Sequence, residues 1–138
     1  MTSDIKTARD FFEACETGQG WDACAPFCHA DSTFAAQSGA LADVKTLAAY
    51  TEWMKGLLVT IPNGAYELTG FAMDAERQTV IASAIFTGHH HGEGGPVPPT
   101  GLRAESDYVY VMKMEAGRVK HVTKIWNDGI ALQQLGWG

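Results

Sequence analysis

The sequence predicts an α+β domain in which helices pack on one face of a curved, mostly antiparallel sheet. Apolar residues recur with helical spacing in the first 60 residues. From Tyr66 onward the chain instead forms long β-rich runs in which alternate residues share a face. Two connections between these runs are tight, which favours hairpins between neighbouring antiparallel strands.

Three helices and one short strand are expected before the main sheet begins. Ser3 can cap the first helix, and Asp43 or Thr46 can open the third. Pro62-Asn63-Gly64 breaks the chain after the third helix. In chain order, the expected elements are a helix over 4–18, a helix over 21–29, a strand over 31–36 and a helix over 44–60.

Four β-rich runs follow, and a short helix or ordered turn over 128–135 ends the chain. The segment 92–101 is too rich in Gly and Pro for regular structure and is expected to be a loop. Gly117 suits the positive φ that a tight turn requires. The four predicted strands cover residues 66–73, 79–91, 103–115 and 118–127.

Length and charge limit the possible functions. A chain of 138 residues predicts one domain spanning 1–138. Its net charge of -6 argues against nucleic acid or an anionic membrane as a main partner, because both attract basic surfaces. No apolar run approaches the roughly 20 residues of a membrane span, and the first residues do not resemble a secretory signal. A cytoplasmic protein is expected.

Neither the cysteines nor the histidines indicate a metal site. Cys15, Cys24 and Cys28 are odd in number and are expected to be reduced thiols, two of them on one helix. The histidine run at 89–91 lies in a predicted strand, so at most two of its side chains share a face and no third ligand is evident. No dinucleotide or phosphate-loop fingerprint is present. We expect neither metal nor organic cofactor.

The two faces of the predicted strand over 103–115 differ in character. One face carries Ala104, Ser106, Tyr108, Tyr110, Met112 and Met114, the composition of a core or an apolar pocket. The other face mixes Val109 and Val111 with charged residues. We expect that outer face to be covered by a second copy of the chain in a homodimer.

Short motifs distributed along the chain resemble those of SnoaL-like polyketide cyclases. Residues 86–92 (FTGHHHG) and 98–101 (PPTG) resemble the family's TGTHTGE…PPTGK strand and loop. Residues 114–119 (MEAGRV) resemble its FEDGKI hairpin. The ending formed by 125–128 (IWND) and 132–136 (LQQLG) resembles its W…D…LLxQLG ending. These motifs have the family's order over nearly the whole chain.

The resemblance implies a fold and a type of chemistry. The family belongs to the nuclear-transport-factor-2-like superfamily, whose cone-shaped, strongly bent sheet wraps around the N-terminal helices. The superfamily also includes isomerases, dehydratases, epoxide hydrolases and non-enzymes, so the fold alone does not give the function. SnoaL-like cyclases close a ring by intramolecular aldol chemistry without metal or organic cofactor, using an Asp near the end of the last long strand.

The same resemblance implies candidate site residues. Counting forward from the last strand places Asp128 at the acid/base position, whereas counting back from the QLG ending places Asn127 there. His90 aligns with a family histidine and suits a proton carrier or a polar contact. Tyr110 stands where many members have Asp. The candidate catalytic residues are Asp128 and His90, and the candidate pocket residues are Tyr108, Tyr110, Met112, Trp126, Asn127 and Trp53.

Three classes of function fit this sequence. The first is a cofactor-independent cyclase, isomerase or lyase that moves protons on a small apolar carbonyl compound. The second is a module that binds a small apolar molecule in the same pocket without chemistry. The third is a structural protein whose cone is filled by side chains. A buried ionisable group in a real cavity favours the first class.

Overall fold

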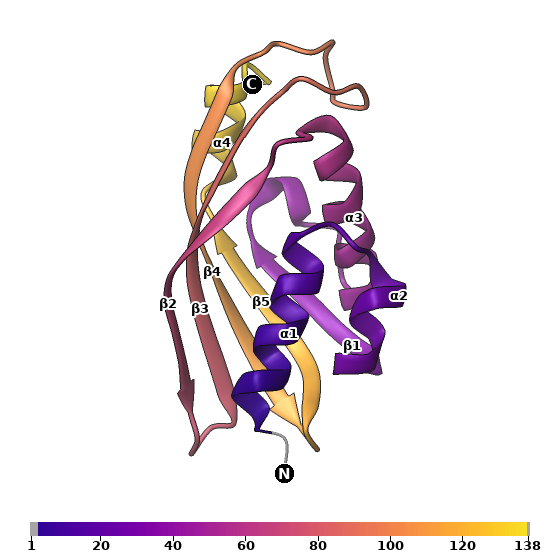
Figure 1. Ribbon diagram of the computed structural model, residues 1–138, viewed down its shortest axis with the longest axis vertical. Helices are drawn as coiled ribbons and strands as arrows, with labels where there is room; N and C mark the ends of the chain where they lie inside the picture. Colours follow the sequence, from indigo (N-terminus) through magenta and orange to yellow (C-terminus); the bar gives the residue numbers. More distant parts are fainter. Residues whose placement is uncertain (1–2, 138) are drawn as a thin grey trace.

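The computed structural model describes residues 3–137, so residues 1, 2 and 138 of the expected domain lie outside the described part. A five-stranded sheet with the order β1-β5-β4-β3-β2 bends around α1 (Asp4–Glu16), α2 (Trp21–Cys24) and α3 (Leu47–Thr60) (Figure 1). The fourth helix, α4 (Asp128–Leu135), packs on β4 near the C-terminal end of the chain. The predicted α+β class is confirmed.

The sheet is antiparallel except at one edge. The strands are β1 (Cys28–Gln37), β2 (Ala65–Asp74), β3 (Thr79–His89), β4 (Arg103–Glu115) and β5 (Arg118–Trp126). The four strands β2 to β5 form an antiparallel meander, and β1 pairs with β5 in parallel. Ala116 and Gly117 both have positive φ, as a type I′ hairpin between β4 and β5 requires.

Side-chain caps define where the two long helices begin. The Ser3 hydroxyl accepts a hydrogen bond from the Lys6 amide at 3.2 Å, which confirms Ser3 as the cap of α1. The Thr46 hydroxyl accepts one from the Ala49 amide at 3.2 Å. Thr46, and not Asp43, is therefore the residue that opens α3.

The prediction of one helix over 21–29 is wrong. The α-helix ends at Cys24, a 3₁₀ helix covers Ala25–Phe27, and Cys28 already begins β1. Pro26 explains the difference, because it has no N–H with which to continue the helical ladder. Cys24 and Cys28 consequently do not lie on one helix face.

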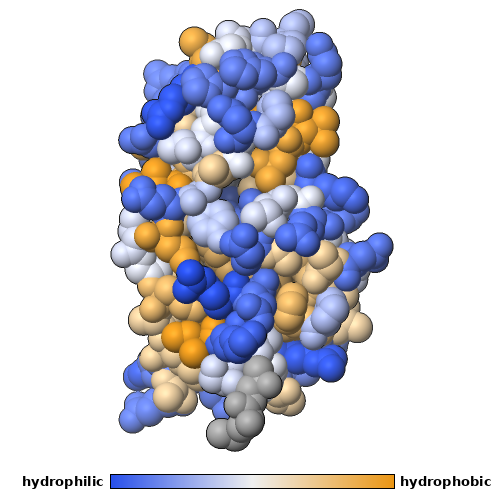
Figure 2. Space-filling model, viewed as in Figure 1, coloured by the Kyte–Doolittle hydropathy of each residue, from blue (hydrophilic) through white to orange (hydrophobic). Residues whose placement is uncertain are grey.

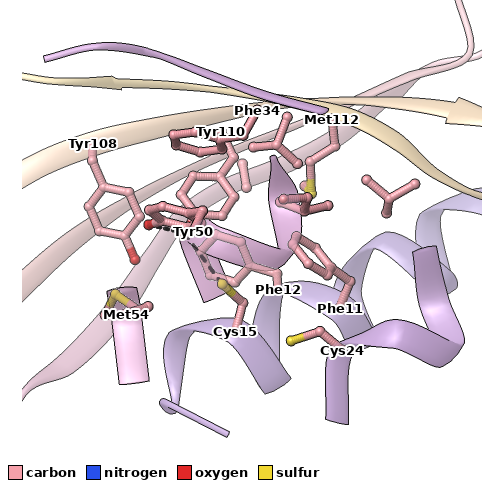
Figure 3. Packing of buried hydrophobic residues seen from close by; sticks show 14 of the residues in the cluster. Phe11, Phe12, Cys15, Cys24, Phe34, Tyr50, Met54, Tyr108, Tyr110 and Met112 are labelled. Atoms are coloured by element: carbon pink, nitrogen blue, oxygen red, sulfur yellow. Dashed lines mark hydrogen bonds between the residues drawn. The ribbon is translucent and has the colours of Figure 1, made fainter. Parts of the chain in front are cut away.

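Aromatic side chains fill the space between the helices and the concave face of the sheet. Phe12 on α1 packs edge-on against Tyr110 on β4, with ring centroids 5.0 Å apart. Phe34 on β1 stacks on Tyr50 of α3 at 4.3 Å. Figure 3 shows this packing around Tyr50, Tyr108 and Tyr110. On the face drawn in Figure 2, apolar patches are small and separated by hydrophilic residues.

The three cysteines are buried and free of disulfides. Burial raises the pKa of the Cys15 and Cys28 thiols well above the usual range, which disfavours the reactive thiolate. We expect the native protein to react slowly with Ellman's reagent, and protein unfolded without reductant to release all three thiols. Rapid native reaction, or fewer than three thiols after unfolding, would contradict this expectation.

Candidate active site

A cavity of about 230 Å³ lies between α3, the sheet and α4. Its walls are mainly apolar and aromatic, the usual character of a small-molecule site. The hollow is smaller than the roughly 300–1,000 Å³ of most drug-sized sites, which suits a compact ligand. The lining residues are Glu16, Ala40, Trp53, Met54, Leu57, Ile61, Phe86, Pro96, Ala104, Tyr108, Lys124, Trp126, Ala131, Leu132, Leu135 and Trp137.

Two of these lining residues, Glu16 and Lys124, carry ionisable acidic or basic groups. Glu16 ends α1 and is 3% exposed, and Lys124 points inward from β5 and is 5% exposed. Charged side chains are seldom buried to this extent unless they are paired or hydrogen-bonded, because removing an ion from water costs several kcal/mol. Two groups whose desolvation is unfavourable, the Glu16 carboxylate and the Lys124 amine, therefore line the same apolar cavity.

A chain of tyrosine hydroxyls links these two residues. The Lys124 ammonium donates to the Tyr50 hydroxyl at 3.0 Å, and the Tyr50 and Tyr110 hydroxyls are 2.5 Å apart. Tyr110 donates its single hydrogen to Glu16, so Tyr50 must be the donor to Tyr110. Tyr108 donates to the other oxygen of the Glu16 carboxylate. The hydrogen bonds thus run in one direction from the amine to the carboxylate.

The tyrosines are kept protonated by their surroundings. Burial raises the pKa of Tyr50, Tyr108 and Tyr110 well above the usual range, and the negative charge of Glu16 raises it further. Figure 3 shows the three rings beside Cys15, whose sulfur lies 4.0 Å from the Tyr110 hydroxyl. These hydroxyls act as fixed donors that stabilise the Glu16 carboxylate.

Lys124 is surrounded by aromatic rings. Its amine nitrogen lies 4.6 Å from the centroid of the Trp126 ring, 5.1 Å from that of Tyr108 and 5.6 Å from that of Trp53. Burial lowers the pKa of the Lys124 amine below its usual range, while the charge of Glu16 acts in the opposite direction. Among the described residues, Tyr50 is its one hydrogen-bond acceptor.

Three of the predicted pocket residues line the cavity. Trp53 comes from α3, Tyr108 from β4 and Trp126 from the end of β5. Tyr110 lies behind the wall in the hydrogen-bond chain, directly opposite Lys124 in the β4–β5 register. Met112 lies two residues after Tyr110 on β4, opposite Val122. It is fully buried and packs in the core away from the cavity.

Asn127 and Asp128 do not line the cavity. β5 ends at Trp126, so both residues belong to the start of α4 and leave the concave face of the sheet. Asn127 caps α4 through its side-chain oxygen, and the Asp128 carboxylate accepts a hydrogen bond from the Ala40 amide at 2.6 Å. Asp128 thereby fixes the turn that carries Ala40 at the cavity wall. The catalytic role predicted for Asp128 stays a prediction, without support from this placement.

His90 is fully buried beside the cavity and is not among its lining residues. Its Nδ1 accepts hydrogen bonds from the Trp137 indole at 2.9 Å and the Thr100 amide at 3.2 Å. These two donors place the proton of the neutral ring on Nε2, which has no partner among the described residues and faces Gly95. His90 thus positions Trp137, which lines the cavity. The catalytic role predicted for His90 stays a prediction.

The loop over 92–101 forms part of the cavity rim through Pro96. It is held against the end of α3 by a hydrogen bond from the Gly92 amide to the Thr60 carbonyl at 2.9 Å. A Cβ at position 92 would come within 2.0 Å of the Val59 carbonyl oxygen, so only glycine fits this contact. Within residues 3–137, no group of three or more His, Cys, Asp or Glu side chains could hold a metal ion.

Glu16 and Lys124 were not among the predicted site residues, although sequence patterns indicate the burial of both. Glu16 lies four residues after Phe12 and eight after Ala8, and therefore on the apolar face of its helix. Lys124 shares strand parity with Val122 and Trp126, which point inward. A charged residue on an apolar face is the signal that could have identified both.

Sequence comparison places the chain in a family. The model of the SnoaL-like polyketide cyclase family matches residues 6–135. The chain belongs to this family. No curated protein is similar enough in sequence to count as a match. The motif resemblance that pointed to SnoaL-like cyclases is thus confirmed over almost the whole chain.

Solved structures confirm the nuclear-transport-factor-2-like fold. A proposed SnoaL-like polyketide cyclase from Jannaschia sp. CCS1 has a TM-score of 0.80 at 15% identity, covering 98% of this chain and 92% of its own. IdmH from Streptomyces antibioticus, a proposed polyketide cyclase, has a TM-score of 0.76 at 19% identity, covering 98% and 99%. AclR from Streptomyces galilaeus, a proposed hydroxylase, has a TM-score of 0.77 at 19% identity, covering 98% and 85%. Different activities are proposed for these neighbours, so the fold does not choose among them.

In the part of the chain that the structure describes, no helix combines the length and the apolar character needed to cross a membrane.

Proposed function

We propose that this protein is a cofactor-independent enzyme that moves protons on a small apolar carbonyl compound, as a cyclase or an isomerase does. One observation carries the proposal: Glu16 and Lys124, both deeply buried, share the wall of an otherwise apolar cavity and are connected through tyrosine hydroxyls. Buried ionisable groups that converge on a pocket are typical of catalytic sites.

The two groups have complementary tasks in such a reaction. Abstraction of a proton next to a carbonyl needs a base at one position and a donor to the developing enolate oxygen at another. Glu16 provides the carboxylate base, and Lys124 provides the donor, both from the same cavity wall. The tyrosine chain joins base and donor, so a proton taken at one end can be balanced at the other.

The cavity walls indicate the class of substrate. Trp53, Trp126 and Tyr108 offer flat aromatic faces, and the remaining wall is aliphatic apart from the two ionisable groups. An uncharged ligand of one or two fused rings with a single carbonyl group matches this composition. Two proposed polyketide cyclases among the structural neighbours are consistent with such a ligand.

The exchange of α-protons for deuterium tests this function without knowledge of the natural substrate. We expect the protein to accelerate exchange of the α-methylene of 1-indanone in deuterated buffer, followed by proton NMR. The variant Glu13→Gln is the matched control, because Glu13 lies on the same helix but is exposed. It should keep the full rate. Binding of 1-indanone without any acceleration would instead indicate a binding module.

The same assay decides between Glu16 and the acid that the family resemblance implied. Loss of exchange in Asp128→Asn, with retention in Glu16→Gln, would return the acid/base role to Asp128. Asp128→Asn also removes the carboxylate that holds the Ala40 amide, so its thermal stability must be measured alongside. We expect Asp128→Asn to retain the deuterium exchange activity and Glu16→Gln to lose it.

We also propose that the outer face of the sheet forms a homodimer. Ile81 lies opposite Val111, and Val109 lies opposite Ile125, so four apolar side chains adjoin on this face. Ile81 and Ile125 are 45% and 47% exposed. Light scattering should give twice the 14.9 kDa mass of one chain. Ile81→Glu should yield monomers, whereas the control Val59→Glu on α3 should not. A wild-type mass near that of one chain would contradict the proposal.

A further inference from the structure

We propose that Lys124 is a nucleophile that forms a covalent imine with the carbonyl group of its ligand. This inference rests on the proposed function and changes the role of Lys124, which bonds covalently to the carbonyl carbon in place of donating a hydrogen bond to the enolate oxygen. It follows from where the amine lies: on the wall of the cavity, among Trp53, Tyr108 and Trp126, which line the same space.

The surroundings of Lys124 favour the free amine that a nucleophile requires. The side chain is 5% exposed, and in the described part of the chain no carboxylate lies within ion-pair distance of its nitrogen. Desolvation lowers the pKa of the amine, which increases the neutral fraction near pH 7. A lysine desolvated in an apolar pocket is a recognised form of activated amine.

A lysine that only forms an ion pair with a carboxylate has different surroundings from those of Lys124. Lys120 lies on the same strand, is paired with Asp31 at 2.9 Å, and its pKa is raised by that hydrogen bond. Lys124 has aromatic faces and a single hydroxyl as its neighbours instead. The two lysines of β5 therefore offer an internal contrast between a surface ion pair and a buried amine.

Groups already present in the site can carry out every proton transfer that imine formation requires. The neutral amine of Lys124 attacks the carbonyl carbon, and transfer of one amine proton to the oxygen gives a carbinolamine. Loss of its hydroxyl group with one further proton releases water and leaves the carbon–nitrogen double bond. The proton that the Lys124 ammonium first gave up to the Tyr50–Tyr110–Glu16 chain then returns to the imine nitrogen. Tyr50 and the Glu16 side chain are the acid–base groups connected to the amine. The protonated imine then withdraws electrons from the neighbouring carbon, whose proton Glu16 takes. Hydrolysis restores the lysine.

Reductive trapping tests the inference. The intact protein is incubated with benzaldehyde and sodium cyanoborohydride at pH 7, where an imine is reduced to a stable benzylamine. Peptide mapping by mass spectrometry then compares the six lysines of the chain. We expect Lys124 to be benzylated at least about ten times faster than Lys120, because only Lys124 offers a desolvated amine inside an apolar pocket. Excess 1-indanone should slow labelling at Lys124 alone.

Two variants complete the experiment. Lys124→Arg keeps a cation but cannot form an imine, and it should lose the fast label, whereas Lys120→Arg should keep it. The wild-type map remains decisive if Lys124→Arg does not fold. Equal or slower labelling of Lys124 would overturn the imine. If 1-indanone exchange still depends on Glu16 in that case, the proposed function stands without the covalent step. If neither labelling nor exchange occurs, both proposals fail.

Discussion

Glu16→Gln should reduce the protein-dependent deuterium exchange of 1-indanone by about 10²–10⁴-fold, the usual worth of a positioned general base. Glutamine fits the same space, and its single amide oxygen can accept a hydrogen bond from one of the two tyrosines, while the other tyrosine hydroxyl faces the amide NH2 group and accepts from it. The change therefore removes the basic group while keeping the local packing.

Binding should respond much less than catalysis. The affinity for 1-indanone, measured by quenching of tryptophan fluorescence, should stay within a few-fold, because the apolar wall provides the contacts. Trp53 and Trp126 lie on that wall and report occupancy. Glu13→Gln serves as the matched control on the same helix. Unchanged exchange in Glu16→Gln would exclude this residue as the base.

Lys124→Met should change the pH dependence of stability. The folded protein holds the Lys124 pKa below its unfolded value, so the unfolded state binds more protons between these two pKa values. Burial of the lysine therefore destabilises the fold fully below the folded pKa, and this penalty disappears as the pH rises toward the unfolded pKa near 10.4. The wild type should accordingly gain stability relative to Lys124→Met as the pH rises.

Urea unfolding from pH 6 to 9 measures this difference. One proton limits the slope to about 1.4 kcal/mol per pH unit. This range stays below the ionisation of the unfolded tyrosines, whose pKa is about 10. Lys120→Met should show no such pH dependence between pH 6 and 9, because Asp31 raises the folded pKa of Lys120 and this lysine stays protonated in both states over that range. A free-energy difference between wild type and Lys124→Met that does not depend on pH would contradict a buried amine.

The fold was more predictable than the site because periodicity reports which face of an element is buried. That rule located the strands and the inward face of β4, on which Tyr108 lies, whereas Trp53 and Trp126 were predicted as pocket residues with the help of the family resemblance. Periodicity indicates which face of a strand is buried, but it does not indicate where along the strand a cavity lies. In this fold the cavity lies at the end of the sheet where Tyr108 pairs with Trp126. Met112, on the same face four residues after Tyr108, therefore lies in the core.

The ionisable residues could not be located by the same reasoning. A glutamate and a lysine are usually solvent-exposed, and their burial depends on partners from distant segments. Glu16 meets Tyr108 and Tyr110 across more than 90 residues of sequence, and Lys124 meets Tyr50 across 74. Asp128 followed the family motif, but the end of β5 at Trp126 turned it away from the cavity.

Titration of the six lysines by carbon NMR tests whether Lys124 is a buried amine that interacts with Glu16. In protein labelled with ¹³C at the lysine Cε, we expect Lys124 to titrate below the other five. We also expect Glu16→Gln to lower the Lys124 midpoint further, because the negative charge of Glu16 raises the pKa of this amine. Titration of Lys124 together with the exposed lysines, unaffected by Glu16→Gln, would show that the two groups do not form a buried acid–base pair.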